Sequence, residues 1–299
     1  MSDTVDKVVV ADCEKTSNVC NVEYADFDKA VTKMREFFKS KGFVEVHTQN
    51  RLSILAACED PTTMATYNYS GSLWPLPQTG QMWLEHYLLK HPDAEGFFCV
   101  STSYRNEPNP VPGRHDKIFP MFEFETKGGM DKMLQLEKEL LEYLGFSKDM
   151  YPDNVYPEGD YEDVATKYDV SILEHEHEER LEKDHGPVYF LKNFPERTSP
   201  FWNMARCDGD PSHSKKVDVI IHGIETIGSA ERSCDKELMR QTFNTISDGG
   251  YADMLYANFS KERVQAEMNE FLSNDFFQRC GGGIGVTRMI RAMKLSNLL

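Results

Sequence analysis

The sequence predicts an α+β fold built around a mostly antiparallel sheet flanked by helices, and three observations support this prediction. Segments with helical periodicity and segments with strand-like composition are interspersed along the 299 residues. Two of the strand-like segments are neighbours in the chain, which is typical of a hairpin. The composition, with 40% hydrophobic and 27% charged residues, is that of a globular protein with a sizeable core.

The first half of the chain is expected to alternate between helices and strands. An aperiodic, extended lead-in at 1–24 precedes a single domain at 25–299, which begins with apolar residues on one helical face from Phe27 until Gly42. Aromatic and β-branched residues mark the strands, and stretches rich in Thr, Ser, Pro and Gly mark loops. The elements expected after the first helix are a strand at 43–47, loops at 59–80, a helix at 82–89 and a hairpin of strands at 97–102 and 118–124.

The second half continues this alternation. A leucine-rich helix at 130–144 ends at Gly145, and an acidic region of mixed character follows at 146–186. The chain closes with a glycine-rich turn and a further helix. The remaining expected elements are strands at 187–191 and 217–222 and helices at 235–246 and 261–272.

Charge and cysteine content narrow the class of protein. The 49 acidic and 33 basic residues give a net charge of −16, which disfavours nucleic acids as default partners because these are bound through Lys and Arg. No apolar run reaches the ~18 residues of a membrane span, and the acidic N-terminus does not resemble a secretory signal. The seven cysteines form no C-x-x-C pair, which favours reduced thiols. We therefore expect a cytoplasmic protein without a membrane segment.

The first cluster of chemically active residues surrounds the loop of the predicted hairpin. It begins with Arg105 and Glu107, continues with Arg114 and His115, and ends at Phe119. Guanidinium groups bind phosphates, an aromatic ring stacks on a base, and a carboxylate accepts hydrogen bonds from amino groups. The cluster therefore predicts a nucleoside triphosphate site, although each residue alone fits an ordinary solvated hairpin.

The second cluster is the glycine-rich segment Gly281–Gly285, followed by Arg288 at the start of an apolar helix. Glycines let a ligand approach the backbone closely, and an arginine at a helix N-terminus favours an anion. The segment lacks the Lys-Ser/Thr pair of a P-loop and does not follow the pattern of a dinucleotide-binding motif. Neither of those two nucleotide sites is expected.

The two clusters together resemble motifs 2 and 3 of the class II aminoacyl-tRNA synthetases, through Tyr-Arg-x-Glu, Arg-His, Phe and Gly-Gly-Gly-Ile-Gly-x-x-Arg. The segment Leu76–Glu85 is similar to the amino-acid-binding segment of the aspartyl and asparaginyl branch, and Phe119–Glu125 is similar to the asparaginyl form. The resemblance covers about residues 25–295. It implies that 25–299 is a class II synthetase-like catalytic domain.

The resemblance implies an ATP site and assigns roles within it. Arg105 is expected to hold the α-phosphate, and the adenine is expected to lie between Phe119 and Arg288. Arg105 and Arg288 are thus the expected catalytic residues, with Arg288 also on the outer phosphates. The implied ATP-binding set is Arg105, Glu107, Arg114, His115, Phe119, Gly285 and Arg288.

An amino-acid end and a metal are also implied. Asp218 and Glu225, seven residues apart as in the family, are expected to hold Mg²⁺ on the phosphates, a role that hard carboxylate oxygens suit. Arg232 is expected to clasp a substrate carboxylate or carboxamide, and the Glu123 and Glu231 carboxylates are candidate bases toward an acceptor amine. The implied substrate-binding set is Glu59, Gln81, Glu123, Ser229, Glu231 and Arg232.

Departures from the family pattern bear on function. Gln49 stands where motif 1 has a proline, and Leu84 stands where aspartyl enzymes have a lysine for the side-chain carboxylate. The usual Gln-Arg pair is Glu231-Arg232, a variant that resembles the archaeal-type asparagine synthetases. Only about 25 residues precede the first core helix, too few for an OB-fold anticodon domain, so tRNA is not an expected partner.

The expected function is that of an aspartate–ammonia ligase, an AMP-forming enzyme of asparagine biosynthesis. Aspartate is activated by ATP and Mg²⁺ to an acyl-adenylate, and ammonia then gives asparagine, AMP and pyrophosphate. One alternative is a ligase that passes activated Asp, Asn or a related amino acid to another acceptor. The other is a regulatory, non-catalytic paralogue, which the intact charged residues of the site disfavour. The family implies a homodimer.

Overall fold

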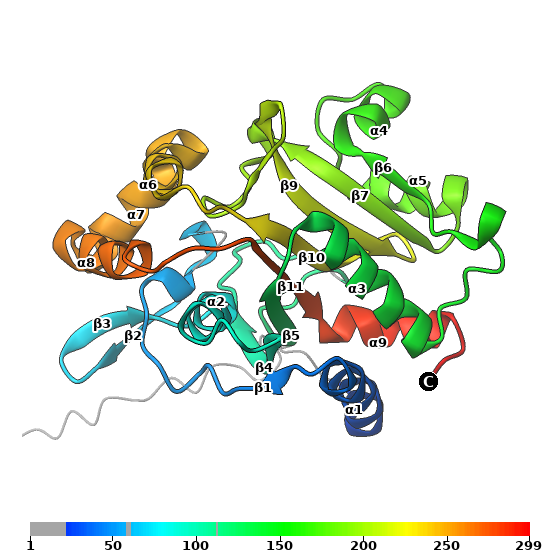
Figure 1. The fold of residues 1–299 in the computed structure, drawn as a ribbon, viewed down its shortest axis with the longest axis horizontal. Coiled ribbons are helices and arrows are strands. Elements are labelled where there is room, and N and C mark those ends of the chain that lie inside the picture. Colours follow the sequence, from blue (N-terminus) through cyan, green and yellow to red (C-terminus); the bar gives the residue numbers. More distant parts are fainter. Residues whose placement is uncertain (1–21, 58–60, 112) are drawn as a thin grey trace, which may run out of the picture.

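The computed structural model describes residues 22–57, 61–111 and 113–299, so nearly all of the expected lead-in lies outside the described residues. The described chain forms a nine-stranded sheet and a separate two-stranded hairpin (Figure 1). The strands of the large sheet are β1 (Val44–Glu45), β4 (Gly96–Tyr104), β5 (Ile118–Lys127), β6 (Glu158–Asp160), β7 (Val188–Pro195), β8 (Arg206–Cys207), β9 (Asp210–Ile221), β10 (Ile224–Arg232) and β11 (Arg279–Gly285).

The strand order of the large sheet is β1-β4-β5-β11-β10-β9-β7-β6, with β8 paired to β9. All pairs are antiparallel except those at the two ends, β1 with β4 and β6 with β7. The expected hairpin is β4 and β5, which pair from Gly96 with Thr126 to Tyr104 with Ile118. The prediction of an α+β fold with a mostly antiparallel sheet is confirmed.

Helices cover the sheet in three groups. They are α1 (Tyr24–Ser40), α2 (Gln81–Lys90), α3 (Met130–Leu144), α4 (Tyr161–Tyr168), α5 (His175–His185), α6 (Lys236–Thr245), α7 (Gly250–Phe259), α8 (Lys261–Leu272) and α9 (Val286–Leu295). Helices α1, α3 and α9 pack on one face of the sheet, α4 and α5 pack beside β7, and α6 to α8 gather near α2. No helix in the described ranges is long and apolar enough to cross a bilayer.

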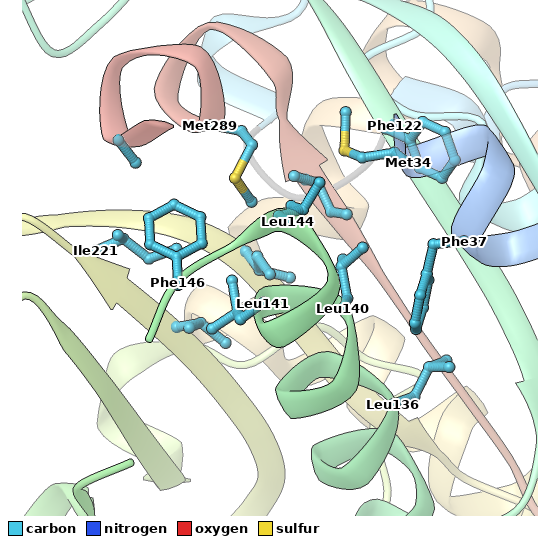
Figure 2. Packing of buried hydrophobic residues seen from close by; sticks show 14 of the residues in the cluster. Met34, Phe37, Phe122, Leu136, Leu140, Leu141, Leu144, Phe146, Ile221 and Met289 are labelled. Carbon is cyan, nitrogen blue, oxygen red and sulfur yellow. The ribbon is translucent and has the colours of Figure 1, made fainter. Parts of the chain in front are cut away.

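The main core lies between the sheet and helices α1, α3 and α9 (Figure 2). Its residues alternate along the strands, so that Phe122 and Phe124 of β5 point into the core while the residues between them point to the other face. The Phe98 and Phe122 rings stack with centroids 5.2 Å apart. Gly145, with φ of 106°, ends α3 in the left-handed conformation as the sequence predicted. Helix α2 packs against part of the opposite face of the sheet, where Leu84 and Leu88 contact Phe97 and Cys99 of β4.

Two sequence predictions about loops are corrected by the structure. The loop region 59–80 contains a hairpin of β2 (Thr66–Tyr69) and β3 (Ser72–Pro75). Its turn has positive φ at Ser70 (51°) and Gly71 (78°), the geometry of a two-residue hairpin turn. The Ser, Thr and Gly content that suggested loops belongs partly to this turn.

The expected glycine-rich turn is instead strand β11, which pairs with β5 on one side and β10 on the other. A Cβ on Gly282 would lie 2.5 Å from Ser229 Cβ, and one on Gly283 would lie 2.7 Å from Met121 Cε. Glycine is therefore required in β11 because Ser229 of β10 and Met121 of β5 lie too close for a Cβ, and β11 remains extended. Strand β10 and helix α7 were also not predicted, and the region 146–186 contains β6, α4 and α5.

Candidate active site

A cavity of about 330 Å³ opens on the face of the sheet opposite α3. Phe119, Met121 and Glu123 of β5 line it at alternate positions, because side chains two apart in a strand share a face. Gly283 of β11 and Arg232 of β10 lie in the same lining. The sheet register thus brings the two sequence clusters to one cavity.

One end of the cavity gathers cationic side chains. Arg105 follows directly after β4, and its guanidinium lies 5.6 Å from the centroid of the Phe119 ring. Arg288, in the first turn of α9, donates from Nη1 to the Glu225 carbonyl at 2.6 Å and from Nη2 to the Arg114 carbonyl at 3.3 Å. A cavity end of this charge suits phosphate groups.

The hairpin loop adds three further predicted residues, Glu107, Arg114 and His115, to the cavity lining. Arg114 Nη2 lies 2.6 Å from Glu178 Oε2, and its Nη1 donates to the Gly223 carbonyl at 3.2 Å. His115 Nδ1 lies 2.8 Å from Glu107 Oε1. Glu107, Arg114 and His115 line the cavity together with Arg288, so the structure brings these four predicted residues together.

The predicted metal ligands meet above Gly228. A Cβ on Gly228 would lie 2.8 Å from Glu225 Oε1 and 3.7 Å from Asp218 Oδ1, so the two oxygens converge on one point. Asp218 Oδ1 is buried and has no hydrogen-bond partner among the described residues. Burial raises the pKa of the Asp218 carboxyl to about 7, and the negative charge of Glu225 adds to this shift.

Burial also acts on Glu225, but the positive charges of Lys216 and Arg288 outweigh it and lower the pKa of the carboxyl. Within the described ranges, no group of three or more His, Cys, Asp and Glu side chains is placed to bind a metal ion. A pair of carboxylates fits Mg²⁺ that takes its remaining ligands from water and phosphates. Asp218 and Glu225 therefore fit the implied ion.

Lys216, which sequence analysis did not single out, lines the same cavity. Its ammonium lies 2.8 Å from Asp218 Oδ2 and 4.0 Å from the centroid of the Phe194 ring. Lys216 and Asp218 share a face of β9 because they are two residues apart. That spacing was the available signal in the sequence.

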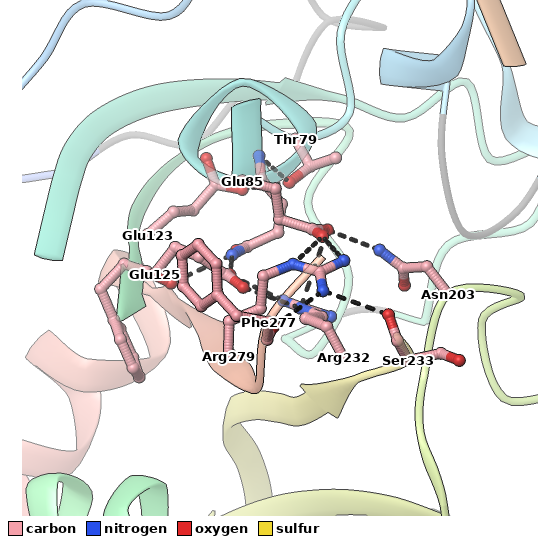
Figure 3. A network of polar contacts seen from close by, with 11 residues as sticks. Thr79, Glu85, Glu123, Glu125, Asn203, Arg232, Ser233, Phe277 and Arg279 are labelled. Atoms are coloured by element: carbon pink, nitrogen blue, oxygen red, sulfur yellow. Dashed lines mark hydrogen bonds and ion pairs between the residues drawn. The ribbon is translucent and has the colours of Figure 1, made fainter. Parts of the chain in front are cut away.

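The opposite end of the cavity contains a buried network of charges (Figure 3). Arg232 lies with Nε and Nη2 each 3.3 Å from an oxygen of Glu125, and the Gln81 amide donates to Glu125 and to the Phe124 carbonyl. Burial raises the pKa of the Glu125 carboxyl to about 7, although Arg232 opposes this shift. Gln81 and Arg232 are thus placed together as predicted, and Glu125 fixes both.

A second acid–base pair, Glu85 and Arg279, contacts this network outside the cavity lining. Glu85 of α2 accepts from Arg279 Nε at 3.0 Å and Nη2 at 2.7 Å, and from the Asn203 amide at 2.5 Å. Arg232 Nε also lies 3.8 Å from Glu85. These supporting roles were not predicted from the sequence, since the partners lie on distant elements.

Glu123 lines the cavity, but its carboxylate is hydrogen-bonded to other residues of the protein. It is buried, and it accepts from the Gly80 amide and from the hydroxyls of Thr79 and Ser101. These bonds hold the segment that precedes α2. The carboxylate is therefore an anchor for the cavity wall and poorly suited to take a proton from an acceptor.

The Ser229 and Glu231 side chains, which the resemblance assigned to substrate binding, are hydrogen-bonded to other residues of the protein. Glu231 Oε2 accepts from the Met130 amide at 2.8 Å, which places the carboxylate at the N-terminus of α3, and Oε1 accepts from Gln278 at 3.1 Å. Ser229 borders the cavity, but its hydroxyl donates to the Val217 carbonyl at 3.4 Å. Both residues share the α3 face with Ile227, because they alternate with Gly228 and Arg232.

Of three other positions singled out in the sequence, only Gly285 lies in the cavity lining. Gly285 lies at the end of β11 in the cavity lining, directly before α9. Leu84 is fully buried in a small cluster beside Phe97 and is not among the lining residues. Glu59 lies outside the described residues. The cavity thus joins a cationic end, Glu225 and an arginine that Glu125 holds, and the buried Asp218 carboxylate lies next to Glu225.

An antiparallel sheet of this topology, with glycine-rich strand β11 leading into an arginine-bearing helix, defines a class II synthetase catalytic core. The chain belongs to the family described as tRNA synthetases class II (D, K and N), whose model matches residues 16–297. Members of this family are ATP-dependent ligases. Aspartyl and asparaginyl relatives agree with the branch that the sequence motifs predicted.

Curated relatives and solved structures support this assignment. Aspartate–tRNA(Asp) ligase of Thermoplasma volcanium is 24% identical over 239 residues, covering 71% of this chain and 53% of the relative. The enzyme of the same name from Pyrobaculum aerophilum is 27% identical over 227 residues, covering 67% and 50%. The chain thus spans about half the length of the curated relatives it matches.

Asparaginyl-tRNA synthetase from Pyrococcus horikoshii, complexed with asparaginyl-adenylate, matches with a TM-score of 0.71 at 17% identity, covering 93% of this chain and 65% of that one. Aspartyl-tRNA synthetase from Entamoeba histolytica matches with a TM-score of 0.65 at 19% identity, covering 90% and 54%. At these identities the likeness concerns the fold.

Proposed function

We propose that this protein activates aspartate with ATP to an acyl-adenylate and then amidates it with ammonia. The observation that supports this most is the joining, in one cavity, of Arg105 and Arg288 at one end and Arg232 at the other. Such a cavity can bind a triphosphate and a carboxylate substrate side by side. Asparaginyl and aspartyl relatives fit an acidic amino acid or its amide.

The first step is an in-line displacement that needs positioning and charge rather than a nucleophilic side chain. A substrate carboxylate oxygen bonds to the α-phosphorus, the bond from that phosphorus to the bridging oxygen breaks, and pyrophosphate leaves. Arg105 stabilises the charge that develops on the α-phosphate, and Arg288 binds the outer phosphates. Mg²⁺ held by Asp218 and Glu225 would neutralise part of the phosphate charge.

The second step requires neutral ammonia. Its nitrogen bonds to the acyl carbon, the bond to AMP breaks, and one proton leaves to solvent. Because Glu123 is bonded to Gly80, Thr79 and Ser101 and Glu231 lies on the other face of the sheet, neither is assigned as a general base. Asparagine formation needs the β-carboxylate at the phosphate, so Arg232 would grip the α-carboxylate.

The substrate is tested by pyrophosphate exchange with each of the twenty amino acids. Aspartate should support the fastest exchange, and product chromatography with aspartate, ATP, Mg²⁺ and ammonium should show asparagine, AMP and pyrophosphate. The rate should rise with pH as ammonium loses its proton. Exchange with asparagine alone, or no exchange with any amino acid, would refute the proposal.

A second candidate is transfer of the activated amino acid to another acceptor, tRNA among them. It is favoured by the relatives named tRNA ligases, whereas the net charge of −16 disfavours a nucleic acid partner. Adenylate formation from aspartate without asparagine at any ammonium concentration would support this candidate. Charging assays with total tRNA then identify the acceptor.

A further inference from the structure

Each carboxylate of the Asp218 and Glu225 pair already has a cationic partner within the chain. Lys216 Nζ lies 2.8 Å from Asp218 Oδ2, and Arg288 Nη1 lies 3.6 Å from Glu225 Oε2. In each pair, one carboxylate oxygen takes the contact. The other two oxygens, Asp218 Oδ1 and Glu225 Oε1, face the shared gap above Gly228.

This gap has the donors that a divalent cation prefers, but the surrounding charge opposes a free ion. The negative side chains around it are Asp218, Glu225 and Glu178, and the positive ones are Lys216, Arg288, Arg114 and Arg105. Glu137 also lies near Asp218, but burial raises the pKa of its carboxyl to about 8, so it adds no negative charge at neutral pH. Four cations therefore face three ionised carboxylates around this gap. A divalent ion entering alone gains little net attraction, whereas the phosphates of a nucleotide supply the missing negative charge.

Lys216 is held in this position from two sides. Its ammonium lies against Asp218 and 4.0 Å from the centroid of the Phe194 ring of β7. An aromatic face attracts an ammonium group, so the charge stays close to the carboxylate. Lys216 thus acts as a resident cation beside the gap.

We propose that Lys216 makes binding of a divalent cation at Asp218 and Glu225 conditional on the nucleotide. The inference rests on the proposed ATP site and adds the order in which the nucleotide and the ion bind there. The ion is excluded from the free protein and enters with the phosphates, because the Lys216 charge repels it until they are present.

Electron paramagnetic resonance of Mn²⁺ tests this without amino acid or turnover. The wild-type protein should bind Mn²⁺ at least tenfold more tightly with the non-cleavable analogue α,β-methylene-ATP than without it. Lys216→Met removes the charge and keeps the length of the side chain, so it should bind Mn²⁺ at least tenfold more tightly than wild type when no nucleotide is present.

Lys215→Met is the matched control. Lys215 is the adjacent residue, but it points to the other face, where its ammonium lies 3.2 Å from Asp208 and 3.6 Å from Glu231. Its Mn²⁺ affinity should equal that of wild type. In the double variant Lys216→Met, Asp218→Asn, the gained affinity should disappear, and thermal melts followed by circular dichroism establish that each variant is folded.

Three results would overturn the inference: tight Mn²⁺ binding by the nucleotide-free wild type, unchanged or weaker Mn²⁺ binding by Lys216→Met, or gained binding that survives Asp218→Asn. Failure of the proposed function gives a different pattern. A protein that binds Mn²⁺ with the analogue but never activates aspartate refutes only the substrate assignment. A protein that does not bind the analogue at all refutes the ATP site, and the inference with it.

Discussion

Replacement of Glu137 by glutamine should remove a pH-dependent loss of stability. Glu137 lies on α3 against β10, its side chain is 0% exposed, and the nearby Ser229 hydroxyl offsets only part of the cost of burying the carboxylate. Burial raises the pKa of this carboxyl from 4.5 to about 8. The folded protein therefore keeps it protonated at pH values where the unfolded chain is ionised, so rising pH favours unfolding.

The size of the effect follows from the width of this pH window. Stability from the group is fully present below the unfolded pKa of 4.5 and is lost as pH rises to the folded value of about 8. Each pH unit within the window costs ~1.4 kcal/mol, which gives about 3 kcal/mol near neutral pH and roughly 4–5 kcal/mol once the loss is complete. Glutamine has nearly the same shape and does not ionise, so Glu137→Gln avoids this loss.

Urea unfolding between about pH 5 and about pH 9 measures the effect. The free energy of unfolding of Glu137→Gln should exceed that of wild type by an amount that grows with pH. Glu139→Gln on the same helix is the control, because Lys41 lowers the pKa of that carboxyl and its contribution is lost only as pH falls. Wild-type and Glu137→Gln curves that run parallel over the whole range would refute the reasoning.

Three further predictions concern the site. Arg105→Ala should slow adenylate formation by ~100-fold, or about 3 kcal/mol of transition-state stabilisation, in a pyrophosphate exchange assay. Arg206→Ala is the control, because Arg206 lies outside the cavity lining and its loss should not change the rate. Equal exchange rates for Arg105→Ala and wild type would contradict the motif assignment. Gly281→Ala should lower the melting temperature because its Cβ would overlap the Glu125 carboxylate, whereas Gly285→Ala has its nearest neighbour at 3.4 Å. Filter binding should find only weak, unspecific tRNA affinity; submicromolar affinity for one tRNA would refute this.

Local sequence patterns predicted those helices and strands whose characteristic residues all lie within a short segment of the chain. Helix 130–144 was predicted with its observed bounds, because leucines at helical spacing precede Gly145. The hairpin at 66–75 was missed because its strands are short and its turn has the composition of a loop. The glycine segment was misread as a turn because close packing, like a turn, excludes side chains.

At the site, too, local patterns predicted some residues, whereas contacts between distant segments were missed. The motifs placed Arg105, Arg288 and Arg232 correctly at one cavity. They could not show that Glu231 faces α3, since the face of a residue depends on the register of β10, a strand that was not predicted. The Glu85–Arg279 pair joins residues 194 positions apart in sequence, a contact that no single-sequence pattern contains.

The buried acid–base network of Figure 3 has a consequence for how this protein can evolve. Glu85, Glu125 and Arg279 are 0% exposed, and Arg232 is 6% exposed, so loss of any one leaves an uncompensated charge that costs several kcal/mol. A new substrate preference therefore cannot arise by drift through single changes in these four residues. We expect variation to accumulate at the uncharged lining residues Thr198, Ser199 and Pro200 instead, where a change of shape leaves the charge balance intact. Natural or laboratory selection for other amino acid substrates would then leave these four charged residues unchanged.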